Sequence, residues 1–213
     1  ALEKWKLLDS ARIKRLVRHV RKYGCRGLYD VVLNHLHSRV RYHDWFLKHR
    51  SAPEKLERQK HMHFVYEPKI SILVPVCHTP VNVFQEMLAS VTAQTYGNWE
   101  LCIAGVCGAN RALETELWCL PKQDPRIRCR ILKKNQGISA NTNTALEMAS
   151  GEFVGLLDHD DILEPDALYE VVHALQDRDT DLVYTDEDKV SSDLTYFTDP
   201  NFKPDFSLDL LRS

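Results

Sequence analysis

Apolar stretches of strand length alternate with stretches of helical periodicity over most of the chain. Residues Ile70–Val76 are apolar and rich in β-branched side chains, which predicts a buried strand. Similar composition predicts further strands at Trp99–Ala104, Ile127–Leu132, Glu152–Leu157 and Asp181–Thr185. Apolar residues at helical spacing predict helices that begin at Pro80 and that span Leu113–Leu120, Ser139–Ala149 and Pro165–Gln176. Strands that alternate with helices are typical of βαβ units, so we predict an α/β fold with a doubly wound, mostly parallel sheet.

Several helix boundaries have signals of their own. Thr79 followed by Pro80 predicts a helix whose N-cap is Thr79. Ser139 is predicted to cap the helix that follows the loop Lys133–Gly137. Pro121 is predicted to end the helix Leu113–Leu120, because proline has no backbone N–H to continue the hydrogen-bond ladder.

The first 67 residues have a different pattern and are predicted to form helices. Apolar residues at i, i+3, i+4 and i+7 predict an amphipathic helix between Ser10 and Gly24; they are Ile13, Leu16, Val17 and Val20. A second helix is predicted at Leu28–Tyr42. A third piece carries Tyr42, Trp45, Phe46 and Leu47.

Charge divides the chain at the same place. Residues 1–67 hold 16 lysines and arginines against 7 acidic residues, whereas residues 68–213 hold 12 against 23. We therefore predict a basic helical accessory segment at 1–67 and a main domain at 68–213. The basic face is interpreted either as a solvated face of a cap on the main domain or as a peripheral membrane contact. The acidic balance of the main domain opposes a phosphate backbone, so we expect no nucleic acid partner.

The cysteines and the apolar runs indicate the class of protein. None of the six cysteines forms a C-x-x-C pair, and Cys102 and Cys129 lie in apolar runs, so we expect buried thiols in a reducing compartment. No apolar run approaches the roughly 18 residues that a membrane span requires. We expect a cytoplasmic protein, held at the inner face of the cell membrane if the basic face binds lipid. We also expect the chain to be a piece of a longer protein.

Ligands of doubly wound sheets bind at the carboxyl ends of the strands. The predicted strand ends are Val76–Thr79, Gly105–Asn110, Asn135–Asn143, Asp158–Asp161 and Thr185–Asp188. A helix start with small polar residues suits an anion, which favours Ser139, Asn141 and Asn143 as ligand contacts. The alternative for the two asparagines is a capping or solvated position in the first helical turn.

The strongest chemical signal is a cluster of acidic residues directly after the predicted fourth strand. Asp158, Asp160 and Asp161 stand there, and residues i and i+2 of an extended chain point the same way, so Asp158 and Asp160 can share one target. Carboxylates this close repel each other unless a cation neutralises them. Oxygen ligands at a strand end suit Mg²⁺ or Mn²⁺ that also holds phosphate oxygens. The alternative is an acidic turn that caps the next helix.

Four segments follow one another in a specific order: Ile70–Val76, Gln136–Ala145, Ser150–Asp161 and Tyr184–Lys189. Together they resemble the family 2 glycosyltransferases with the GT-A fold, nucleotide-diphospho-sugar transferases. The resemblance covers residues 68–213 and is closest to the branch that builds bacterial O-antigen, rhamnan and other cell-envelope polysaccharides. It implies a metal-dependent glycosyltransferase with a UDP-, dTDP- or GDP-linked sugar donor and a saccharide or lipid-linked acceptor.

The resemblance also implies roles for individual residues. Pro75 and Val76 would border the nucleobase, and Asp158 would face the ribose or the metal ion. Asp160 would coordinate the metal ion that bridges the diphosphate. The loop and helix start near the nucleotide would contribute Gly137, Ser139, Asn141 and Asn143.

In such an enzyme an acceptor hydroxyl attacks the anomeric carbon with help from a carboxylate base. In inverting members of the family the base lies several tens of residues after the D-x-D motif, which here is Asp158-His159-Asp160. We therefore expect the base beyond Ser213. The candidates for the base within the chain are Asp186, Glu187 and Asp188. The alternative interpretation is that these three residues form a structural acidic turn.

One stretch departs from the family pattern. Members usually carry an aspartate at the end of the second strand that holds the nucleobase, whereas Ala104–Gly108 contains no carboxylate. Cys77 and His78 stand where tyrosine and asparagine are common, and His78 is either a replacement contact to the base or a surface loop histidine. The alternative to an enzyme is therefore a non-catalytic GT-A-like scaffold or binding domain that has lost recognition of the donor base.

Overall fold

The computed structural model of the protein describes residues 41–177 and 179–207. Their contacts group into two compact units, Ser51–Val183 and a second unit that joins the residues up to Arg50 with those from Tyr184 onward. The amphipathic helix predicted between Ser10 and Gly24 and nearly all of the one at Leu28–Tyr42 lie outside the described residues. The predicted domain boundary after residue 67 stays a prediction.

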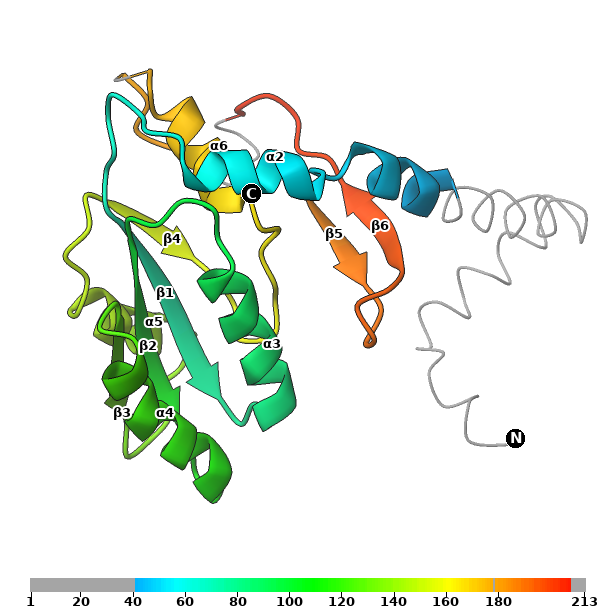
Figure 1. Ribbon diagram of the computed structural model, residues 1–213. Helices are drawn as coiled ribbons and strands as arrows, with labels where there is room; N and C mark the ends of the chain where they lie inside the picture. The colour runs from blue at the N-terminus through cyan, green and yellow to red at the C-terminus, as the bar shows by residue number, and fades with distance from the viewer. Residues whose placement is uncertain (1–40, 178, 208–213) are drawn as a thin grey trace, which may run out of the picture. The chain divides into compact units, whose positions relative to one another are not determined.

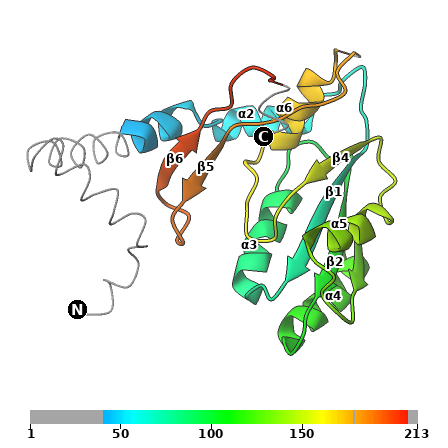
Figure 2. The ribbon, with the colours of Figure 1, turned by 180° about the vertical axis from the view of Figure 1, so that it is seen from behind.

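A four-stranded parallel sheet forms the centre of the unit Ser51–Val183 (Figures 1 and 2). Its strands lie in the order β3-β2-β1-β4, where β1 is Ile70–Cys77, β2 Trp99–Val106, β3 Ile127–Ile131 and β4 Phe153–Leu156. The helices are α2 Pro53–Lys60, α3 Val81–Thr92, α4 Arg111–Gln123, α5 Ile138–Leu146 and α6 Ala167–Ala174. In the described part of the chain, no helix combines the length and the hydropathy needed to cross a membrane.

Helices cover both faces of this sheet, which confirms the predicted doubly wound α/β fold. Phe84 of α3 and Leu117 of α4 are buried against one face. Ala145 of α5 packs with Leu73 and Cys102 on the other face. Figures 1 and 2 accordingly show α5 on the opposite side of the sheet from α3 and α4. The central strands β1 and β2 are buried on both faces, which explains their nearly continuous apolar sequences.

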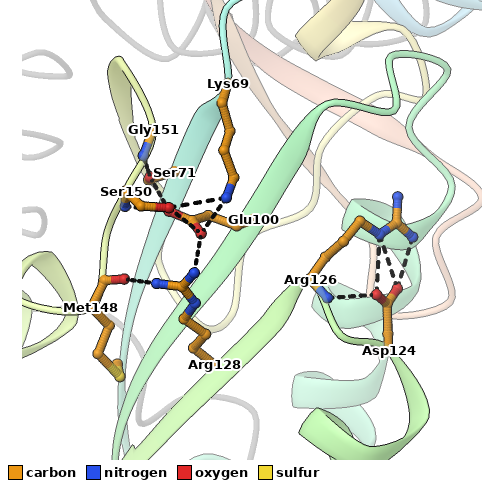
Figure 3. Close-up of polar contacts among 9 residues, drawn as sticks. All are labelled: Lys69, Ser71, Glu100, Asp124, Arg126, Arg128, Met148, Ser150 and Gly151. Carbon is orange, nitrogen blue, oxygen red and sulfur yellow. Dashed lines mark hydrogen bonds and ion pairs between the residues drawn. The ribbon is translucent and has the colours of Figure 1, made fainter.

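One buried carboxylate interrupts the apolar sequence of β2. The Glu100 side chain lies at the amino end of the sheet and accepts a hydrogen bond of 2.7 Å from the Ser71 hydroxyl (Figure 3). The Lys69 ammonium lies 2.8 Å and the Arg128 guanidinium 3.3 Å from the same carboxylate. These contacts join β1, β2 and β3 at the end of the sheet opposite to the carboxyl ends of the strands.

The prediction of a fifth sheet strand at Asp181–Thr185 is wrong. These residues form no strand, and Leu182 is 61% exposed. In the second unit, β5 (Glu187–Val190) pairs antiparallel with β6 (Phe197–Asn201) instead. The short apolar alternation in Asp181–Thr185 resembles a half-buried strand, but no neighbouring strand offers it a hydrogen-bond partner among the described residues.

The three residues predicted to mark helix boundaries, Thr79, Ser139 and Pro121, do not mark them. The N-cap of α3 is Pro80 rather than Thr79, because the helix begins one residue later, and α5 begins at Ile138 with Gly137 as its N-cap rather than Ser139. Gly137 has a φ of 92°, which glycine adopts without strain. Pro121 lies inside α4, which continues to Gln123. Pro121 cannot donate to the Leu117 carbonyl, but the last turn still forms, and the Asp124 N–H donates to the Leu120 carbonyl at 3.0 Å.

The second unit is held by aromatic contacts between residues 41–49, which are helical, and the β5–β6 hairpin. The rings of Phe46 and Phe197 have centroids 4.2 Å apart. The backbone N–H of Phe197 donates to His43 Nδ1 over 3.3 Å, and the Tyr42 hydroxyl donates to Asp188 over 2.7 Å. The aromatic residues of this segment therefore pack on the buried Phe197 of the hairpin.

Candidate functional site

Two adjoining hollows lie where the carboxyl ends of β1 and β4 meet the start of α5. They share three lining residues, Pro75, Ile138 and Asp158. The chain runs from β1 outward to β3 and then returns to the other side of β1 for β4. In an open parallel sheet, ligands bind outside the carboxyl ends of the strands at such a reversal of strand order. The hollows therefore lie at the position where this topology predicts a ligand site.

The first hollow has a volume of about 280 Å³ and mostly apolar walls. Ile138 is 68% exposed and Leu156 76% exposed, so both present apolar surface to solvent. Its full lining is Leu73, Pro75, Ile138, Ser139, Thr142, Asn143, Leu156, Leu157 and Asp158. An apolar surface with a few polar groups at its border is typical of small-molecule sites.

The second hollow, of about 230 Å³, is bordered by the two carboxylates of the D-x-D sequence. Its lining is Pro75, Cys77, Asn135, Ile138, Asn141, Asp158, His159 and Asp160. Among the described residues, neither Asp158 nor Asp160 forms an ion pair with a lysine or arginine. The Nδ1 atom of His159 is buried, lies 3.7 Å from an Asp160 carboxylate oxygen and has no hydrogen-bond partner there. The two carboxylates are therefore available to a cation.

Protein side chains alone do not complete a metal site here. Within 41–177 and 179–207, no group of three or more His, Cys, Asp or Glu residues is arranged to hold a metal ion. Mg²⁺ in phosphate sites is commonly held by one or two carboxylates and takes its remaining ligands from phosphate and water. Asp158 and Asp160 at the border of one hollow fit that donor set, so a metal ion fits this site when a phosphate accompanies it.

The loop before α5 is held by a hydrogen-bond network. Asn135 Oδ1 accepts from the Gly137 backbone N–H at 2.9 Å and from Asn141 Nδ2 at 3.0 Å. Asn135 Nδ2 donates to the Cys77 Sγ at 3.2 Å. No described side chain caps the N-terminus of α5. Its first backbone N–H groups therefore remain able to face an anion.

The structure brings most of the predicted nucleotide and metal residues together. The two hollows are lined by Pro75, Ser139, Asn141, Asn143, Asp158 and Asp160, while Gly137 lies between them as the N-cap of α5. Val76 is fully buried in the core and lines neither hollow. His78 has a φ of 56°, is exposed and lies beside Gly108 rather than in a hollow. The binding roles of these residues stay predictions.

The carboxylates proposed as substitutes for the base belong to the second unit and have partners there. An Asp186 oxygen accepts from the Lys203 backbone N–H at 2.6 Å. The hydrogen bond from the Lys203 ammonium, aided by one from Asn201, lowers the pKa of Glu187. Asp188 accepts from the Tyr42 hydroxyl. A lowered pKa makes Glu187 a weaker base than an ordinary glutamate.

Leu156 and Leu157 line the first hollow without having been predicted as site residues, and Ile138 and Thr142 were predicted only as part of the segment Asn135–Asn143. They lie next to named residues at a strand end or helix start, and that position was the available signal. The stretch after β2 contributes to neither hollow. Asn110 there caps α4 by accepting from the Leu113 N–H at 3.1 Å, and it donates to the Thr79 carbonyl at 3.2 Å.

The described cysteines are free thiols; Cys102 and Cys107 are buried as predicted, whereas Cys77, Cys119 and Cys129 are only partly buried. Burial raises the pKa of Cys102 to about 11 and that of Cys129 to about 12. These thiols therefore stay protonated at neutral pH and act as small apolar groups. Cys77, in contrast, is half-buried at the end of β1 and borders the second hollow.

Comparison with known proteins gives a family and several relatives. The family model described as "Glycosyl transferase family 2" matches residues 71–209. The chain is 43% identical over 145 residues to the uncharacterized protein y4gI of Sinorhizobium fredii, which covers 68% of this chain and 16% of that protein. It is 35% identical over 147 residues to the O-antigen biosynthesis protein RfbC of Myxococcus xanthus, covering 68% of this chain and 12% of that protein.

The chain therefore spans less than a fifth of the length of these two relatives. Among solved structures, the TarS protein of S. aureus in complex with UDP is 24% identical to this chain. Their structural alignment has a TM-score of 0.45 and covers 51% of this chain and 32% of TarS.

Proposed function

Because the chain belongs to glycosyl transferase family 2, we propose that it binds a nucleotide-diphosphate sugar for transfer to a saccharide or lipid-linked acceptor. The sugar donor is UDP-, dTDP- or GDP-linked. The product class is a cell-surface polysaccharide, which the similarity to an O-antigen biosynthesis protein supports. Because this chain covers 12% of that relative, the activity of the whole protein is part of the proposal.

The observation that carries the proposal is the position of Asp158. Its carboxylate borders both hollows, and Asp160 borders the second one beside it. A donor has an apolar or neutral portion at each end of a negatively charged diphosphate. A site in which a mostly apolar hollow adjoins a second hollow lined by Asp158 and Asp160 matches that division of chemistry.

The residues around the two hollows would have different roles in binding the donor. Ile138 and Leu156 offer apolar surface to a ring of the donor, and the uncapped start of α5 offers backbone N–H groups to phosphate oxygens. Asp158 and Asp160 would hold Mg²⁺ or Mn²⁺, which, when bound, supplies positive charge opposite the leaving diphosphate. The carboxylate base comes from Asp186, Glu187 or Asp188, or from a part of the protein after Ser213.

Calorimetric titration of UDP, dTDP and GDP, each with and without Mn²⁺, tests the proposal. We expect one of the three to bind in the presence of Mn²⁺ and to bind at least about tenfold more weakly without it. Asp160→Asn keeps the side-chain shape and removes the charge, so it should abolish the effect of Mn²⁺. Asp161→Asn is the matched control, since the next aspartate lines neither hollow. Absence of binding to all three nucleotides overturns the proposal.

One observation favours the alternative, a non-catalytic GT-A-like scaffold. The stretch Ala104–Gly108 has no carboxylate, and Cys107 is buried. Asn110, the first polar side chain after β2, is occupied by bonds to Leu113 and Thr79. A scaffold of this kind would bind no nucleotide in the titration above, so the same experiment separates the two functions.

We place this function in the cytoplasm, at the inner face of the cell membrane, where nucleotide sugars meet lipid-linked acceptors. The basic segment 1–67 supports a membrane contact through its charge. Flotation of the protein with vesicles that contain or lack anionic lipid tests this part of the proposal. Binding that does not depend on anionic lipid contradicts it.

A further inference from the structure

The Asn135 side chain joins three separate segments around the second hollow. Its Oδ1 accepts from the Gly137 N–H, just before α5, and from Asn141 Nδ2, within α5. Its Nδ2 donates to the Cys77 Sγ at the end of β1. Asn135, Cys77 and Asn141 all line this hollow. One amide therefore fixes the distance between the end of β1 and the start of α5.

Asn141 completes this arrangement from inside the helix. It is only 3% exposed. Its Nδ2 donates to Asn135, and its Oδ1 accepts from the Gln136 backbone N–H at 3.4 Å. Both polar atoms of its side chain are thus directed at the loop 135–137. A side chain with this burial and these partners has little left to offer a ligand directly.

We propose that Asn135 and Asn141 form a positioning pair that holds the loop before α5 in the conformation that receives the nucleoside diphosphate. This inference rests on the proposed function and adds to it a role for two residues that act through others. The α5 backbone and the residues that line the hollows then contact the ligand. The Asn135–Asn141 pair determines the position of these contacting groups.

The physical reason is the backbone at Gly137. Its φ of 92° turns the chain into α5, and no described side chain caps the helix. The Asn135 amide holds this turn by accepting from the Gly137 N–H, and it leaves the N–H groups of the first turn of α5 to the ligand. Fixing the loop before the ligand arrives reduces the entropy lost on binding, so affinity depends on the pair without any contact between Asn141 and the ligand.

Hydrogen exchange of the ligand-free protein tests the structural half of the proposal. Asn135→Ala removes the acceptor for the Gly137 N–H, so exchange of that amide should become about tenfold faster, the factor expected for one lost hydrogen bond. Asn135→Asp keeps an acceptor oxygen and should restore the protection. Thr144→Ala is the control, because Thr144 donates to the Ala140 carbonyl in the same helix and lines neither hollow. Equal exchange in wild type and Asn135→Ala overturns the proposal.

Nucleotide titration in the presence of Mn²⁺ tests the functional half. Asn135→Ala and Asn141→Ala should each weaken binding about tenfold, and the double variant should also be weakened only about tenfold, since either change releases the same loop. Two independent ligand contacts would instead give about a hundredfold loss in the double variant. Thr144→Ala should bind as wild type does.

The outcomes separate this inference from the proposed function. Wild-type protein that binds none of the nucleotides overturns both. Wild-type binding with unchanged affinity in the two single variants overturns the positioning role alone. Additive losses in the double variant also overturn it, because they assign Asn141 a separate contact with the ligand.

Discussion

The Lys69 ammonium lies 2.8 Å from the Glu100 carboxylate at the amino end of the parallel sheet. Glu100 is 1% exposed and also accepts hydrogen bonds from Ser71 and Ser150. Burial alone would raise the pKa of Glu100, but the hydrogen bonds from Lys69, Ser71 and Ser150 outweigh it and lower the pKa to about 2. The folded protein therefore favours the charged carboxylate.

This relationship predicts a pH-dependent contribution to stability. The folded-state pKa lies below the ordinary value of 4.5, so the contribution is complete above about pH 4.5 and is lost as the pH falls toward about 2. Glu100→Gln should lower the free energy of unfolding by roughly 2–3 kcal/mol at pH 7 and flatten this acid dependence. Urea denaturation at a series of pH values measures both effects.

Glu147→Gln is the matched control for Glu100. Glu147 also pairs with an arginine, Arg130, but its side chain is 65% exposed. An exposed pair contributes about 0–1 kcal/mol, so this variant should unfold almost as wild type does. Equal losses in the two variants would contradict the role given to the buried carboxylate.

A second stability prediction concerns Gly151, in the turn before β4. A β-carbon there would lie 2.6 Å from the Lys69 carbonyl oxygen and 2.6 Å from the Ser71 hydroxyl. Gly151→Ala should therefore destabilise the protein by roughly 1–3 kcal/mol, because the backbone of β1 must move. Gly97→Ala, where a β-carbon meets no atom within 4 Å, should change the melting temperature little. Thermal unfolding of the two variants measures both effects. A Gly151→Ala variant with the melting temperature of wild type would contradict the close approach of residue 151 to Lys69 and Ser71.

Substitutions in the apolar wall of the first hollow should weaken nucleotide binding without destabilising the protein. Ile138 and Leu156 are exposed and line the hollow. Replacing either by serine should weaken nucleotide binding roughly threefold to tenfold, because apolar contact area is lost, while stability changes by less than about 0.5 kcal/mol. Leu182→Ser is the control, since Leu182 is 61% exposed and lies outside both hollows. Unchanged affinity in the Ile138 and Leu156 variants would remove this wall from the site.

The pair of Glu187 and Lys203 predicts an observable titration. The Lys203 Nζ lies 2.6 Å from a Glu187 carboxylate oxygen, and this hydrogen bond is the main reason why the pKa of Glu187 is lowered. Lys203→Met should return the pKa of Glu187 toward its ordinary value. Carboxyl-carbon NMR titration of both proteins measures the change, and identical titrations would contradict the contact.

The strands β1 and β2 were predictable because burial on both faces requires a mostly apolar sequence. The sequences of β1 and β2 are apolar since both faces of these strands are covered, and their predicted limits differ from the observed ones by at most two residues. β5 has the sequence Glu-Asp-Lys-Val and pairs with β6, so hydrophobic periodicity carried no signal for it. Asp181–Thr185 carried that signal and forms no strand.

The candidate site was predictable to the extent that it follows from topology. The carboxyl ends of parallel strands lie at one edge, and this alone predicted that the end of β1 and Asp158 lie together. The orientation of single side chains does not follow from topology. Val76 points into the core and Asn141 is turned toward Asn135, and both depend on packing that a pattern of residue types does not contain.

The most direct test of the account is a crystal of the protein soaked with Mn²⁺ and the nucleoside diphosphate that binds it. Anomalous scattering from manganese locates the ion independently of the nucleotide. The account predicts manganese coordinated by Asp158 and Asp160, with the nucleotide lying in the two hollows between β1, β4 and the start of α5. Manganese and nucleotide bound at any other place on the protein would contradict it.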